Sequence, residues 1–101
     1  MTVESFVKIL QSYKKDSCYN DYLFCITDKE MLYIDSFDMV DNMCYFWLTR
    51  EERYKTPKSL VAELKKYAWQ KDWTVAFEFD GKLYHYESSM KVFNNLEIKL
   101  K

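Results

Sequence analysis

The only histidine, His85, is the residue best suited to proton transfer at neutral pH, because an unperturbed imidazole titrates near pH ~6.5. Strand alternation places it on a polar face near Glu78 and Glu87. An imidazole oriented by a carboxylate can act as a general base or as half of a metal site. With no second histidine and no nucleophile nearby in the sequence, an acid/base or metal-dependent enzyme around His85 ranks third among the functions considered.

Two carboxylate–x–lysine triplets, Asp80-Gly81-Lys82 and Glu97-Ile98-Lys99, contain the residue types with which metal-dependent nucleases hold Mg²⁺. A tight turn accounts for the first triplet and strand alternation for the second. A calcium loop starting at Asp35 fails, because its twelfth position is Phe46 instead of glutamate. The single glycine excludes a phosphate-cradling loop. We therefore predict no catalytic residue, no metal and no cofactor.

The three cysteines are Cys18, Cys25 and Cys44, an odd number whose spacings match neither a disulfide framework nor a zinc site. Cys25 and Cys44 lie in apolar runs and are expected to be small buried side chains. Cys18 lies in a polar stretch, which predicts an exposed thiol. No neighbouring residue supplies the base that a catalytic cysteine needs.

Charge is distributed unevenly along the chain. The formal net charge is only −1, but residues 16–49 contain seven acidic residues and one lysine. Aromatic and methionine residues are interleaved with these acids, and such side chains are enriched in protein–protein contacts. The alternative is a solvated acidic face that only aids solubility. The predicted binding residues are Asp28, Glu30, Tyr33, Asp35, Phe37, Asp38 and Asp41.

Two amphipathic helices are expected to support this segment. The first begins after Thr2, the predicted cap, and has apolar residues at helical spacing as far as Tyr13. The second begins at Thr56 with Pro57 in the first helical position. The two helices align at a constant offset of 54 residues; the matching residues are Thr2, Ser5, Phe6, Val7, Leu10 and Tyr13 with Thr56, Ser59, Leu60, Val61, Leu64 and Tyr67.

Three strands are predicted after each helix, at residues 22–27, 31–36 and 43–48 and at residues 73–79, 82–88 and 95–100. Asp80-Gly81 favours a two-residue type I′ turn. This register pairs Phe79 with Lys82, Phe77 with Tyr84 and Val75 with Tyr86. In the last strand, Leu96, Ile98 and Leu100 point inward.

The predicted fold class is therefore α+β, an antiparallel sheet of five to six strands with two helices on one face. The predicted order is one helix and three strands, repeated, which suggests an internal duplication of residues 2–49 and 56–101. A chain of 101 residues is one domain, 1–101. Neither half is expected to bury its apolar face alone.

Composition narrows the function classes further. The balanced charge argues against direct nucleic-acid binding, and no apolar run is long enough to span a membrane. The N-terminus lacks a signal-peptide layout, so a soluble cytoplasmic protein is expected, as a monomer or homodimer.

The leading hypothesis is a non-catalytic interaction module, of the inhibitor or immunity type that phages and mobile elements encode. Its acidic, aromatic-rich surface would bind a basic protein or nucleoprotein, in one version as a nucleic-acid mimic. The alternative is a small-ligand module that uses an aromatic groove between the two halves.

Overall fold

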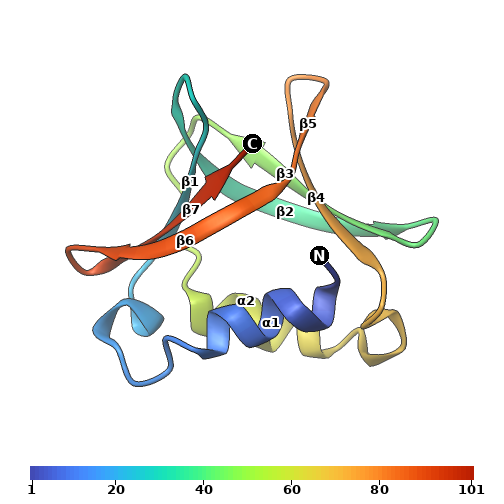
Figure 1. Ribbon diagram of the computed structural model, residues 1–101, viewed down its shortest axis with the longest axis horizontal. Helices are drawn as coiled ribbons and strands as arrows, with labels where there is room; N and C mark the ends of the chain where they lie inside the picture. The colour runs from blue at the N-terminus through green and yellow to red at the C-terminus, as the bar shows by residue number, and fades with distance from the viewer.

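The computed structural model describes all residues, 1–101, as two α-helices and a curled seven-stranded sheet (Figure 1). The helices are α1 (Val3–Gln11) and α2 (Pro57–Lys65), and 3₁₀-helices η1 (Ser17–Asn20) and η2 (Ala68–Gln70) follow them. The strands are β1 (Leu23–Ile26), β2 (Met31–Val40), β3 (Met43–Thr49), β4 (Thr74–Phe79), β5 (Lys82–Tyr84), β6 (Tyr86–Val92) and β7 (Asn95–Leu100). The α+β class is therefore as predicted.

Both helices begin with the same reciprocal cap. In α1 the Ser5 amide donates to Thr2 Oγ1 at 3.1 Å, and the Thr2 amide donates to Ser5 Oγ at 2.9 Å. In α2 the Ser59 amide donates to Thr56 Oγ1 at 3.0 Å, and the Thr56 amide donates to Ser59 Oγ at 3.1 Å. Each cap satisfies two backbone donors that a helix N-terminus leaves free, so the predicted starts of both helices are confirmed.

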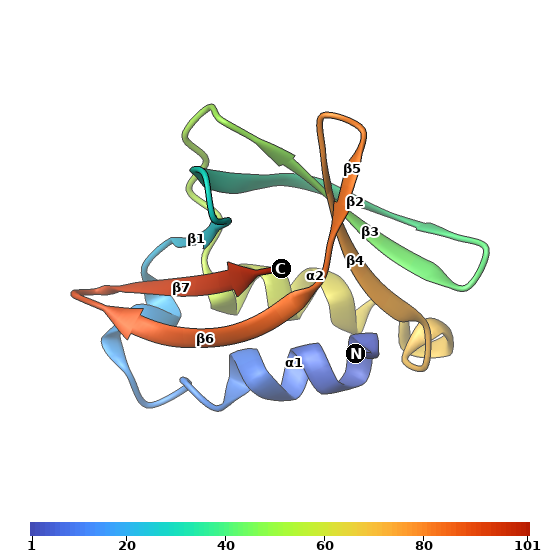
Figure 2. The same ribbon diagram turned by 45° about the horizontal axis from the view of Figure 1, so that its top comes forward.

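The sheet is mixed, which corrects the prediction of a wholly antiparallel sheet. Its strand order is β5-β4-β3-β2-β1-β7-β6, and the pairs β3·β4 and β1·β7 are parallel. Each parallel pair joins the last strand of one half to the first strand of the other. Parallel neighbours need a crossover, and the segment containing α2 provides it between β3 and β4. The figures show α1 and α2 side by side on the same side of the sheet (Figures 1 and 2).

The strand predicted at residues 82–88 is two strands, which is why seven strands are present. At His85 the chain leaves β4, and the His85 backbone exchanges two hydrogen bonds with Lys101 at 2.8 and 2.9 Å. Phe79 pairs with Lys82 and Phe77 with Tyr84, as predicted. The predicted pairing of Val75 with Tyr86 is wrong, because Tyr86 pairs with Leu100 of β7.

Each half consists of an α-helix, a 3₁₀-helix and then strands, three in the first half and four in the second, and the halves share one specific hydrogen bond. The Leu23 amide donates to the carbonyl of Lys55, and the Val75 amide donates to the carbonyl of Met1, both at 2.9 Å. In each case the first strand of one half is bonded to the residue that precedes the helix of the other half. The one before α1 lies beside β4, and the one before α2 lies beside β1.

The core lies between the helices and the inner side of the sheet. The Phe6 ring of α1 lies 5.4 Å from the Phe46 ring and 5.9 Å from the Phe77 ring, and these two rings stack at 5.2 Å. All three side chains are fully buried. Aromatic pairs add roughly 0.5–1.5 kcal/mol beyond the area that they bury. This cluster therefore ties α1 to the β3·β4 joint.

Three two-residue turns connect antiparallel strands, and one of them is strained. Asp41-Asn42 and Asp80-Gly81 have positive φ at both residues, which Asp, Asn and Gly tolerate. The turn between β6 and β7 places Phe93 at φ 55°, although its side chain is 91% exposed and packs against nothing. For a bulky residue this conformation costs roughly 1–2 kcal/mol relative to ordinary backbone.

We predict that Phe93→Asn stabilises the fold by about 0.5–1 kcal/mol, because Asn tolerates positive φ and little packing is lost. This corresponds to a rise in Tm of roughly 2–8 °C for a domain of this size, measurable by calorimetry. Trp69→Asn is the matched control, because Trp69 is 94% exposed but has no positive φ. A lower Tm for Phe93→Asn would contradict the interpretation of strain.

Candidate functional site

One outer surface of the sheet combines exposed acids with aromatic rings. Alternation in β3 buries Cys44, Phe46 and Leu48, so Met43, Tyr45 and Trp47 lie on the opposite side, where each is half-buried. We name this surface the acidic–aromatic face; its residues are Asp38, Val40, Asp41, Met43, Tyr45, Trp47, Glu78 and Leu83.

Strand register makes this face continuous across both halves of the chain. On one side of β3, Asp38 and Val40 of β2 lie opposite Tyr45 and Met43. On the other side, Glu78 of β4 lies opposite Trp47, and Leu83 of β5 lies opposite Glu78. Directly opposed residues in adjacent strands have neighbouring side chains. The face therefore spans four strands, two from each half.

Two contacts hold the Trp47 ring in place. The Tyr45 and Trp47 rings stack, with centroids 5.6 Å apart and planes 18° apart. The Trp47 Nε1–H donates a hydrogen bond of 2.6 Å to Asp38 Oδ2. A ring fixed in this way loses little conformational entropy on binding.

The structure divides the predicted binding residues between three environments. Asp38 and Asp41 lie on the acidic–aromatic face; Asp41 begins the turn after β2, with φ 48°. Glu30 and Asp35 are each paired with an arginine. Arg50 bonds both Glu30 carboxylate oxygens at 2.6 and 3.3 Å, and Arg53 bonds Asp35 at 2.8 Å.

The remaining predicted residues do not join this face. Asp28 lies in the exposed turn between β1 and β2. Tyr33 is buried, and burial raises the pKa of its hydroxyl above the usual value of 10.0. Phe37 points into the core, where its ring lies 5.6 Å from both Phe46 and Tyr67.

Sequence reasoning missed Glu78 and Leu83 as members of the face. Both belong to the second half and reach the face only through the parallel β3·β4 pairing, which the sequence analysis did not predict. The alternation of β3 between buried and half-buried residues was a usable signal for Tyr45 and Trp47.

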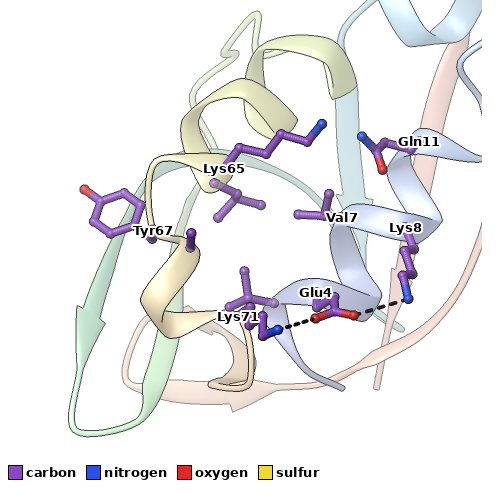
Figure 3. A pocket seen from close by; sticks show the side chains of 10 residues that line it. Glu4, Val7, Lys8, Gln11, Lys65, Tyr67 and Lys71 are labelled. Atoms are coloured by element: carbon purple, nitrogen blue, oxygen red, sulfur yellow. Dashed lines mark ion pairs between the residues drawn. The ribbon is translucent and has the colours of Figure 1, made fainter.

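A second surface feature is a groove between α1 and the segment from α2 to η2 (Figure 3). Its volume is about 280 Å³. Its apolar floor is lined by Val3, Val7, Leu64 and Ala68. Three lysines lie around it, Lys8, Lys65 and Lys71. We name it the interhelical groove. It lies between the helices of the two halves, and Tyr67 is its single aromatic lining residue.

The residues around His85 are engaged elsewhere. Glu78 accepts a hydrogen bond of 2.7 Å from the Gly81 amide, and Glu87 pairs with Lys99 at 3.2 Å. The backbone of His85 pairs with Lys101, while its side chain is exposed. No group of three or more His, Cys, Asp or Glu side chains is placed to hold a metal ion.

Comparison with protein-family models, curated proteins and solved structures finds no significant match to this chain. Neither helix has the length and apolar character needed to cross a membrane.

All three thiols are free and buried, which corrects the prediction of an exposed Cys18. Cys18 lies in η1, which packs against α2 and β7, so the polar stretch around it does not expose the thiol. Burial raises the pKa of Cys44 to about 12 and raises that of Cys25 still further. Neither thiol forms a reactive thiolate at neutral pH.

These pKa shifts predict that stability falls at alkaline pH. The thiols ionise near pH 9.0 in the unfolded chain but stay protonated in the fold. Stability is therefore fully present below pH ~9, and each thiol lowers the unfolding free energy by about 1.4 kcal/mol per pH unit above it. Urea unfolding from pH 8 to 11 measures this slope. In Cys44→Ala the loss of unfolding free energy per pH unit should be smaller by the contribution of one thiol, about 1.4 kcal/mol. An unchanged slope would contradict the raised pKa of Cys44.

Proposed function

We propose that this protein is a non-catalytic interaction module whose acidic–aromatic face binds a basic surface of a protein partner. The observation that carries the proposal is the Trp47 ring, which Tyr45 and Asp38 fix and which lies between Asp38 and Glu78 on the acidic–aromatic face. The role that fits best is that of an inhibitor or immunity-type protein, of the kind that phages and mobile elements encode.

The free charges of the face support a basic partner. Arginines already neutralise Glu30 and Asp35, whereas Asp38, Asp41 and Glu78 have no ion pair within the protein. Exposed carboxylates of one sign steer an oppositely charged partner and accelerate association. These three carboxylates would attract and orient a basic partner as it approaches the face.

The aromatic residues would supply most of the affinity. Tryptophan and tyrosine are enriched among the residues whose truncation costs an interface roughly 2 kcal/mol or more. Met43 precedes Tyr45 on the same side of β3 with Val40 opposite it, and Leu83 lies beyond Glu78 on the other side, so apolar side chains border the two rings at both ends of the face. Such a rim excludes water from the central contact. A basic nucleoprotein is one candidate partner, for which the carboxylates would replace nucleic-acid phosphates.

The proposal also includes the cellular compartment and the oligomeric state. Three free buried cysteines and no disulfide are typical of a reducing compartment, which supports action in the cytoplasm. The module would act as a monomer or homodimer, without direct nucleic-acid binding.

The experiment is affinity capture from the native host, followed by binding kinetics with the purified partner. The test variant combines Asp38→Asn, Asp41→Asn and Glu78→Gln. It removes three charges, but the amide oxygens can still accept the hydrogen bonds from Trp47 and Gly81. At low salt we expect the association rate of this variant to be at least ~10 times lower than that of the wild type. The wild-type association rate should itself fall steeply as the salt concentration rises from about 0.05 M to about 0.5 M.

The matched control combines Asp21→Asn, Asp72→Asn and Glu97→Gln, three acids outside the face that form no ion pair, so it changes the net charge equally. It should bind like the wild type. Trp47→Ala should weaken binding roughly 30-fold or more through faster dissociation. A partner that binds all of these variants equally, or with a rate independent of salt, would contradict the proposal.

A further inference from the structure

The interhelical groove has an apolar floor that the protein does not cover. Val3 and Leu64 are almost fully buried, so their side chains form the bottom of the groove. Val7 is half-buried and Ala68 is exposed, which leaves methyl groups open along its length. Trp69, which follows Ala68 directly, is 94% exposed.

Positive charge around this floor exceeds negative charge. Glu4 is the only acid that lines the groove, and it is shared between Lys8 at 3.2 Å and Lys71 at 3.9 Å (Figure 3). Lys65 lies on the other wall and has no ion pair. Three ammonium groups therefore face one carboxylate, and an added anion would meet uncompensated charge.

The apolar floor and the surrounding lysines together favour a ligand that has an alkyl chain and a negative charge. We propose that the interhelical groove binds small amphiphilic monocarboxylates, with the alkyl chain on the valine and leucine side chains and the carboxylate beside Lys65 or Lys71. The groove volume of about 280 Å³ lies just below the roughly 300–1,000 Å³ of most ligand pockets, which favours a small ligand such as a medium-length alkyl chain. A ligand with several phosphates would leave the apolar floor unused.

This site is independent of the acidic–aromatic face. The groove is formed by the helices and η2, whereas the face belongs to β2, β3, β4 and β5. Loss of either activity would therefore leave the other intact. The groove also differs from the aromatic one expected from the sequence, because valine, leucine and lysine provide its chemistry.

The test follows the methyl groups of the groove by NMR while sodium octanoate or decanoate is added below its micelle concentration. We expect saturable shifts at Val3, Val7 and Leu64, and none at Leu83, which is exposed on β5 away from the groove. Each added methylene should tighten binding about fourfold, so decanoate should bind about 15 times more tightly than octanoate. Decyltrimethylammonium, which has the same tail and a positive head, should bind at least ~10 times more weakly than decanoate.

Substitutions distinguish the contribution of the apolar floor to binding from that of the surrounding lysines. Ala68→Phe should fill the groove and abolish the shifts, while Lys65→Gln and Lys71→Gln together should weaken decanoate binding several-fold. Lys15→Gln and Lys58→Gln together are the matched control, because both lysines are exposed and neither lines the groove. Equal binding of the cationic amphiphile, or shifts spread over the whole chain, would overturn the proposal. A response to an acidic amphipathic peptide but not to decanoate would also overturn it and identify a protein-docking groove.

Discussion

The parallel pairing of β3 with β4 is the contact on which the rest of this structure depends. It joins the third strand of one half to the first strand of the other, and the buried Phe6, Phe46 and Phe77 rings lie at that joint. Parallel strands require a crossover, and here the crossover contains α2. The β1·β7 pair repeats this joint on the other side of the sheet. Each half thus completes the sheet of the other.

The same joint separates two surfaces of opposite charge. The outer side of β2, β3 and β4 carries carboxylates without ion pairs around fixed aromatic rings, while lysines surround the groove between the helices. A formal net charge of −1 is therefore the sum of an acidic sheet surface and a basic helical surface. Because the acidic–aromatic face takes strands from both halves, it exists only when the joint forms.

Local signals in the sequence predicted local structure well. Thr2 and the Thr56-Pro57 pair predicted where both helices begin, Asp80-Gly81 predicted its turn, and alternation predicted the inward residues of β7. The parallel joints were not predicted, because pairing between strands distant in the chain leaves no short-range signal. β2 continues past the predicted end at Ser36, and a bulge after Ile34 shifts its alternation by one residue, so that Phe37 lies inside and Asp38 outside. Cys18 is buried by tertiary contacts that its polar neighbours in sequence do not reveal.

The most direct test of this account is to produce residues 1–55 and 56–101 as separate chains and record the NMR spectrum of each, alone and mixed. The division falls between β3 and α2, immediately before the Thr56 cap. Because each fragment lacks the parallel partners of its outer strands, the account predicts that both are unfolded alone and form a folded 1:1 complex on mixing. A dispersed, native-like spectrum from either fragment alone would contradict the mutual dependence of the two halves.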